Sequence, residues 1–138
     1  MTTRVLVVDD DATVRRLLRV MLEADGYTVA EAQGGAEALD ILRQSPDRLV
    51  VLLDHLMPGL TGADVLERAA SEGGRLTAHG YILISANDNR AALDLAADLA
   101  SLSAAILTKP VNRAVLSRTV RRVAETTGAA AGDGGRGQ

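Results

Sequence analysis

The chain has 138 residues, 47% of them hydrophobic and 24% charged, with a formal net charge of −3. This composition is typical of one globular domain with a sizeable apolar core, and it excludes a largely disordered chain. The lack of cysteine excludes disulfides, thiolate zinc sites and iron–sulfur clusters, and the acidic balance argues against direct nucleic-acid binding. Because the sequence has neither a signal-peptide pattern nor a spanning apolar run, we expect a cytoplasmic protein without membrane contact.

Short aliphatic runs alternate with helical patterns along the chain. The expected strands are residues 4–8, 27–32, 49–53, 81–84 and 104–107. Apolar residues at helical spacing predict helices over 12–24, 35–45, 63–70, 88–102 and 111–125. Residues 54–62 contain one proline and two glycines and are expected to form a loop, whereas 71–80 is expected to be a polar connection.

This order repeats a strand and a helix five times. Strands that are apolar on both faces imply a parallel sheet covered by helices on both sides, a doubly wound α/β fold. Residues 126–138 are rich in Gly and Ala without apolar periodicity, so we expect a disordered tail or linker after a domain of residues 1–125. In such sheets ligands bind beyond the carboxyl ends of the strands, which directs attention to the residues that follow each strand.

Four aspartates follow two of the expected strands. Asp9, Asp10 and Asp11 come after the first, and Asp54 comes after the third. Converging carboxylates repel one another, and an oxygen-only cluster suits Mg²⁺, with Mn²⁺ as the alternative ion. Asp residues also cap helices and open turns without any further role. We expect Asp11 to be the cap, which leaves Asp9 and Asp10 for a cation.

The other strand ends carry groups that suit phosphoryl chemistry. Asp54 can ligate a metal or attack phosphorus. Ser85 can donate a hydrogen bond to a phosphoryl oxygen, and its alternative role is a helix cap. Lys109 is the only lysine beside 14 arginines, and at a strand end its ammonium can offset anionic charge. Its alternative role is a solvated surface group.

Four segments together resemble the receiver domain of two-component response regulators. They are VLVVDDD at 5–11, DHLMPGLTG at 54–62, ILISA at 82–86 and TKP at 108–110. The resemblance covers about residues 4–125, and the D-x-x-M-P-G-x-x-G segment with the strand-end Lys-Pro is specific. It implies a flavodoxin-like fold with a five-stranded parallel sheet in the order 2-1-3-4-5.

The resemblance also implies a role for each strand-end residue. Asp54 matches the phosphoacceptor, which takes its phosphoryl group from a histidine kinase or a phosphotransfer protein. The implied Mg²⁺ ligands are Asp9, Asp10, Asp54 and the main-chain carbonyl of Leu56. Ser85, Ala86 and Lys109 match the groups that contact the phosphoryl oxygens. Beyond its own phosphorylation and dephosphorylation the domain would catalyse nothing, and it would switch a surface for a downstream protein partner.

The chain departs from the family at one switch position. Three residues before the lysine, receivers usually carry Tyr or Phe, and here the residue is Ile106. An aliphatic side chain cannot swing a ring between two pockets, so we expect no aromatic switch. Leu56 and Asn87 occupy positions that affect the access of water to the acyl phosphate in this family.

Opposite charges on two helical segments suggest a homodimer. Residues 88–102 carry three aspartates against one arginine, and residues 111–124 carry four arginines without an acid. In the family the surface formed by the fourth helix, fifth strand and last helix often makes dimers. The hypothesis pairs residues across two subunits, and the residues are Asp94, Asp98, Arg118 and Arg122. The alternative is two solvated faces, since exposed pairs contribute about 0–1 kcal/mol each.

Two other functions remain open. Residues 9–14 (DDDATV) resemble the D-x-D-x-T-V motif of haloacid-dehalogenase-type phosphatases, with Asp9 as nucleophile and Asp11 as acid/base. That family needs further acids after its lysine, and the first aspartate beyond Lys109 is Asp133 in the expected tail. The second alternative is a receiver-like interaction module that acts without phosphate. No DNA-binding output is expected after residue 125.

Overall fold

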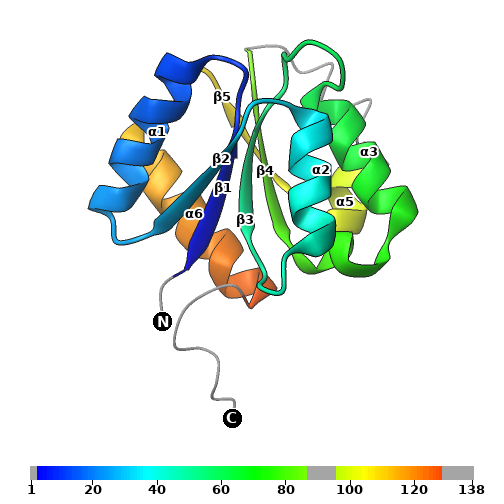
Figure 1. Ribbon diagram of the computed structural model, residues 1–138. Helices are drawn as coiled ribbons and strands as arrows, with labels where there is room; N and C mark the ends of the chain where they lie inside the picture. Colours follow the sequence, from blue (N-terminus) through cyan, green and yellow to red (C-terminus); the bar gives the residue numbers. More distant parts are fainter. Residues whose placement is uncertain (1–2, 87–95, 129–138) are drawn as a thin grey trace.

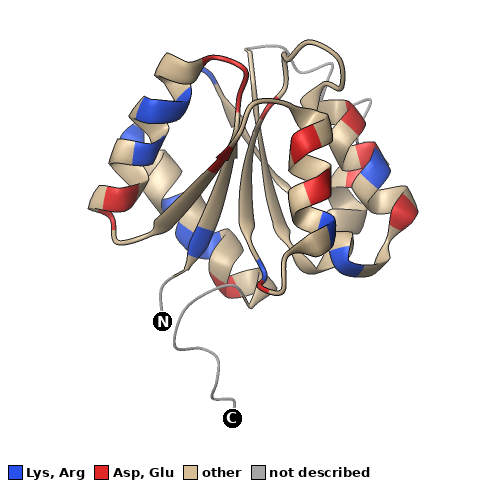
Figure 2. Cartoon of the chain, viewed as in Figure 1, with Lys and Arg blue, Asp and Glu red and all other residues tan. Residues whose placement is uncertain are grey.

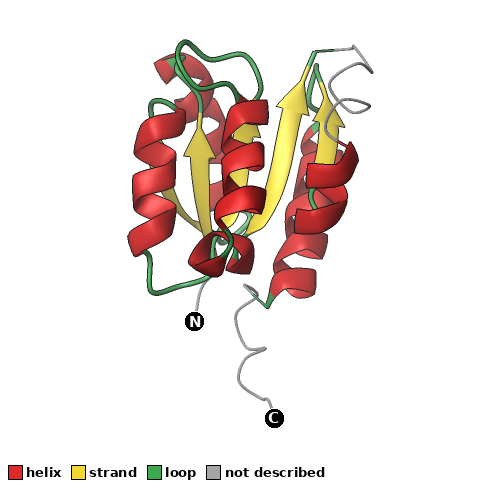
Figure 3. Ribbon diagram, turned by 90° about the vertical axis from the view of Figure 1, so that its right-hand side faces the viewer, coloured by secondary structure: helices red, strands yellow, loops and turns green. Residues whose placement is uncertain are grey.

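A single parallel sheet forms the centre of the computed structural model, which describes residues 3–86 and 96–128. Its strands are β1 (Arg4–Val8), β2 (Thr28–Ala32), β3 (Val50–Asp54), β4 (Gly80–Ser85) and β5 (Ala105–Thr108). They lie in the order β2-β1-β3-β4-β5, and every neighbouring pair is parallel. All arrows therefore point to one edge of the sheet (Figure 3), and the expected order 2-1-3-4-5 is confirmed.

Helices cover both faces of this sheet, as Figure 1 shows. Those described are α1 (Ala12–Ala24), α2 (Gly35–Gln44), α3 (Gly62–Glu72), the 3₁₀ helix η1 (Gly74–Ala78), α5 (Ala96–Leu102) and α6 (Arg113–Thr127). The side chains of α1 and α6 share one apolar cluster, and those of α2 and α3 share the other. The doubly wound arrangement expected from the alternating pattern is therefore present.

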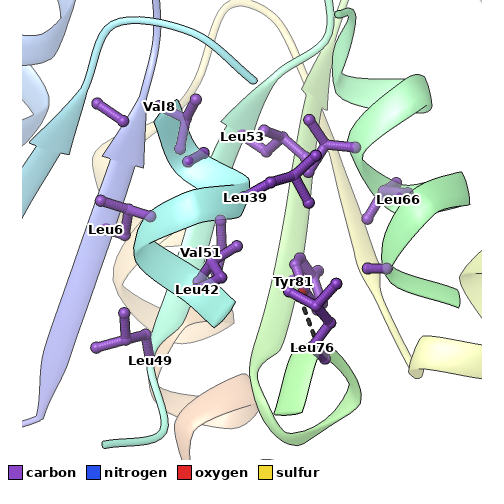
Figure 4. Packing of buried hydrophobic residues seen from close by; sticks show 14 of the residues in the cluster. Leu6, Val8, Leu39, Leu42, Leu49, Val51, Leu53, Leu66, Leu76 and Tyr81 are labelled. Carbon is purple, nitrogen blue, oxygen red and sulfur yellow. Dashed lines mark hydrogen bonds between the residues drawn. The ribbon is translucent and has the colours of Figure 1, made fainter. Parts of the chain in front are cut away.

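The two clusters follow from the period of two in each strand. In β1, Leu6 and Val8 point to the cluster under α2, whereas Val5 and Val7 point to the cluster under α1 and α6. Figure 4 shows the first cluster, in which leucines of α2 and α3 meet the aliphatic side chains of β1 and β3. Because both faces are buried, the strands read as continuous apolar runs in the sequence.

Most element ends lie within two residues of the expected ones, and three differences are informative. The connection expected at 71–80 contains η1, where Leu76 is buried and its carbonyl accepts a 2.6 Å hydrogen bond from Tyr81 Oη. Asp54, expected to open a loop, is the last residue of β3. The last helix continues to Thr127 and ends at Gly128, whose φ of +78° is left-handed. Residues 88–95 of the expected helix 88–102 lie outside the described residues.

Asp11 caps α1 as expected. Its side chain accepts hydrogen bonds from the main-chain N–H groups of Thr13 at 2.9 Å and Val14 at 3.3 Å. The cap satisfies two of the donors that the first turn leaves free.

No helix in the described ranges 3–86 and 96–128 is long and apolar enough to cross a bilayer.

His79, just before β4, links α2 to the residue before β3 in the interior, at the amino edge of the sheet. Its Nδ1 accepts a hydrogen bond from Leu49 N–H at 3.0 Å, so the ring proton resides on Nε2, which lies 2.9 Å from the carbonyl oxygen of Leu42. Burial lowers the pKa of His79 below its usual range. A protonated ring would lose the bond from Leu49.

This geometry predicts a pH dependence of stability. In the unfolded chain His79 takes up a proton near its ordinary pKa of about 6.5, while the folded chain keeps the ring neutral. The free energy of unfolding should therefore fall as the pH drops below about 6.5, by at most about 1.4 kcal/mol per pH unit from this group. Urea unfolding between pH 7.5 and 5.5 measures it, with His79→Gln as the non-titrating control. An identical pH dependence in the two proteins would contradict the assignment.

Candidate functional site

Four chemically active side chains gather at the carboxyl edge of the sheet. Asp9 follows β1, Asp54 ends β3, Ser85 ends β4 and Lys109 follows β5. Because β3 lies between β1 and β4, the order of the strands brings these residues together from distant parts of the sequence. Figure 2 shows acidic segments after β1 and at the end of β3 at this edge.

Three carboxylates form a cluster there. Asp9, Asp10 and Asp54 each place one oxygen within 4.8 Å of the others. Asp9 and Asp54 are each only 5% exposed, whereas Asp10 is exposed. Burial, and to a smaller extent the charge of Asp54, raises the pKa of Asp9, although a 2.9 Å hydrogen bond from the N–H of Asp11 opposes the shift. The cluster is therefore short of positive charge.

Lys109 supplies part of that charge. Its Nζ lies 2.8 Å from Oδ1 of Asp54, and this contact raises the pKa of the lysine. This ion pair is the only polar contact at hydrogen-bonding distance that the described residues give the buried Oδ1. A buried carboxylate that lies between an acidic pair and a single ammonium fits a hard cation such as Mg²⁺.

The β3–α3 connection explains the residues of the D-x-x-M-P-G-x-x-G segment. Met57 is buried in the core, and Gly59 has a φ of +76° that favours glycine. A Cβ on Gly62 would lie 2.6 Å from the carbonyl oxygen of Asp54, so only glycine lets α3 begin this close to the site. Thr61 caps α3 in a capping box with Asp64. The Leu56 side chain is 63% exposed beside the site.

Ser85 lies at the same edge of the sheet, and its hydroxyl forms a hydrogen bond with the next residue. The residue is buried, and its Oγ donates a 3.1 Å hydrogen bond to the carbonyl of Ala86. The carbonyl of Ser85 accepts a 2.8 Å bond from the N–H of Lys109, which ties β4 to the residue that follows β5. Ile106 is half-buried on β5 and packs against the core cluster under α2 and α3.

The structure thus brings Asp9, Asp10, Asp54 and Lys109 into direct proximity. Of the residues named for a dimer, Arg118 and Arg122 are exposed on α6, and Asp98 is half-buried on α5. Asp94 and Asn87 lie outside the described residues.

Sequence reasoning missed one contact of the site. Arg15 on α1 donates a 2.7 Å hydrogen bond from Nη1 to the main-chain carbonyl of Asp9. In the sequence Arg15 is one of several polar residues of an amphipathic helix, with no feature that separates it from Arg16. The position of the Arg15 side chain depends on which residue of β2 faces the helix. The helical periodicity of the sequence does not reveal that residue.

Comparison with known proteins places this geometry in a family. Residues 5–121 match the response regulator receiver domain. The chain is 42% identical over 103 residues to the response regulator MprA of Mycobacterium sp. (strain KMS), a match that covers 71% of this chain and 43% of that protein. The chain therefore spans less than half the length of this relative.

Solved structures agree with the sequence match. A response regulator receiver domain protein from Clostridium thermocellum is 28% identical, with a TM-score of 0.75 over 91% of this chain and 97% of that one. The receiver domain of the Francisella response regulator 1452 is 27% identical, with a TM-score of 0.78 over 91% and 99% of the two chains. The chain belongs to the response regulator receiver domain family.

Proposed function

We propose that this receiver domain accepts a phosphoryl group on Asp54 from a histidine kinase or a phosphotransfer protein. The observation that carries the proposal is the buried Asp54 carboxylate, whose Oδ1 lies 2.8 Å from the Lys109 ammonium at the carboxyl edge of the sheet. The carboxylate is held beside two further acids. Such an arrangement supports attack on phosphorus more than a role as a turn residue.

Each group has a part in the proposed transfer. Mg²⁺ would be held by Asp9, Asp10, Asp54 and the main-chain carbonyl of Leu56, and it would supply charge neutralisation for the acids and the incoming phosphoryl oxygens. A carboxylate oxygen of Asp54 attacks the phosphorus of a phosphohistidine as the phosphorus–nitrogen bond breaks. Lys109 then pairs with a phosphoryl oxygen instead of the free carboxylate. The Ser85 hydroxyl breaks its hydrogen bond to the carbonyl of Ala86 and donates to a second phosphoryl oxygen.

Phosphorylation adds nearly two negative charges at this edge of the sheet. Because the N–H of Lys109 is bonded to β4, a movement of Lys109 and Ser85 toward the phosphoryl group displaces β4 and β5 together. We propose that this displacement changes the surface formed by α5, β5 and α6, which binds a downstream protein partner. Ile106 moves within the aliphatic core during this change. Because its side chain is aliphatic, no aromatic ring changes rotamer at this position.

Two alternatives remain as outcomes of experiment. A receiver-like interaction module without phosphorylation would leave Asp54 unmodified. A haloacid-dehalogenase-type phosphatase would carry its phosphoryl group on Asp9, whose Oδ1 is already bonded to the N–H of Asp11. The ion pair of Asp54 with Lys109 favours the receiver mechanism over the phosphatase.

The first test identifies the phosphoacceptor. Incubation with acetyl phosphate and Mg²⁺ should increase the intact mass by one phosphoryl group, and EDTA should abolish the increase. Asp54→Asn should remove it completely, while Asp11→Asn should retain it because Asp11 caps the helix. No mass increase in the folded, unchanged chain would favour the interaction module, and a label mapped to Asp9 would favour the phosphatase.

A second test separates phosphorylation from switching. Lys109→Arg keeps the positive charge near Asp54, so phosphorylation by acetyl phosphate should continue at a comparable rate. The planar guanidinium cannot take the place of a compact ammonium beside the phosphoryl oxygen, so hydrogen exchange in β5 and α6 should no longer respond to phosphorylation. A response equal to that of the unchanged chain would count against the proposed role of Lys109.

A third test concerns the proposed homodimer. Arg118 and Arg122 are exposed on α6, where they can pair with acids of a second subunit. Light scattering over a concentration series should show a dimer whose population rises with a phosphate mimic and falls with added salt. The double variant Arg118→Glu and Arg122→Glu should remain monomeric. A monomer at all concentrations, with and without the mimic, would exclude the dimer.

A further inference from the structure

Arg15 is held at two points on two different elements. Its side chain is 11% exposed, and Nη1 donates to the carbonyl of Asp9 at 2.7 Å. Nε donates to Oε1 of Glu31 on β2 at 2.9 Å. Rotation of the guanidinium by a half-turn about the side-chain axis would break both hydrogen bonds. The guanidinium therefore has one defined position over the carboxyl edge of the sheet.

Glu31 is anchored in turn by a second arginine. Its other oxygen, Oε2, accepts a 2.6 Å hydrogen bond from Nη1 of Arg19. Hydrogen bonds from Arg19 and Arg15 lower the pKa of Glu31, which therefore stays ionised at neutral pH. In Figure 2 the basic segments of α1 lie beside an acidic segment of β2. The contact of Arg15 with Glu31 is therefore part of a network rather than an isolated surface pair.

The carbonyl that Arg15 holds belongs to the peptide between Asp9 and Asp10. The N–H of Asp9 donates to the carbonyl of Ala32 at the end of β2, at 3.2 Å. Within the described ranges no hydrogen bond or ion pair holds the exposed carboxylate of Asp10. The backbone therefore sets the range of positions that this carboxylate can reach through its rotamers, and Arg15 fixes the peptide that precedes it.

We propose that Arg15 is a positioning residue of the cation site, which orients the Asp9–Asp10 peptide so that the Asp10 carboxylate meets Mg²⁺ beside Asp9 and Asp54. The inference rests on the proposed function, because it deepens the metal site of that proposal. Arg15 itself contacts neither the cation nor the phosphoryl group. Its partner Glu31 fixes the guanidinium to the edge strand.

Positioning and simple electrostatics predict opposite results when the arginine is removed. A guanidinium near three carboxylates repels a divalent cation, so its removal tightens cation binding if only its charge matters. If its hydrogen bonds matter, removal weakens binding by about tenfold, as for other groups that orient metal ligands. The sign of the change therefore distinguishes the two roles.

Titration with Mn²⁺, followed by the electron paramagnetic resonance signal of the free ion, measures the affinity directly. Arg15→Gln and Arg15→Lys should each bind Mn²⁺ about tenfold more weakly than the unchanged chain. The Mn²⁺ affinity of Glu31→Gln should lie between that of these two variants and that of the unchanged chain. Arg16→Gln is the matched control, since it removes one positive charge from the exposed neighbour of Arg15. It should bind equally well or slightly more tightly. Circular dichroism shows which variants are folded.

A kinetic measurement separates positioning from a general loss of structure. The Mg²⁺ concentration that half-saturates phosphorylation by acetyl phosphate should rise about tenfold in Arg15→Lys, while the rate at saturating Mg²⁺ should match that of the unchanged chain. Unchanged or tighter Mn²⁺ binding in a folded Arg15 variant would overturn the positioning role and leave the proposed function intact. A lack of Mn²⁺ binding by the unchanged chain would overturn the metal site and this inference with it.

Discussion

Two carboxylates at the ends of adjacent strands cannot both be charged and buried without nearby positive charge. Asp9 and Asp54 are placed in this way, and the single ammonium of Lys109, which forms an ion pair with Asp54, serves both of them. The resulting deficit of positive charge is the feature on which the site depends. In the proposed function this deficit serves the binding of a divalent cation and the transfer of an anionic group. It also requires a rigid scaffold to hold the repelling groups together.

The scaffold meets that requirement through packing. β3 is buried along its whole length between two helical layers, so Asp54 ends a strand that cannot shift without disturbing both clusters. Gly62 lets α3 start against the backbone of Asp54, and Arg15 ties the turn after β1 to the edge strand β2. The carboxylates are therefore fixed from β1, β2, β3 and α3 at the same time.

Residue patterns predicted the strands and the alternation of elements because both faces of a parallel sheet select aliphatic side chains. The cap at Asp11 was predictable from the preference of Asp for the start of a helix. The order of the strands and the role of each acid came from the resemblance to receiver domains. The burial of Leu76 was not predicted, because it depends on packing against residues of two other elements, α2 and α3. The contact of Arg15 was missed for a similar reason, since its partners lie on β1 and β2.

The last helix ends far from the chemistry. α6 begins after Lys109 at the carboxyl edge and runs back along the sheet to Thr127, whose carbonyl accepts a 3.0 Å hydrogen bond from Arg48 just before β3. A strand of five residues spans about 16 Å, so a fluorophore or affinity handle attached at Gly128 would be separated from the carboxyl end of β3 by about the length of a strand (Figure 1). Immobilisation at the end of α6 would leave the carboxylate cluster facing the solution.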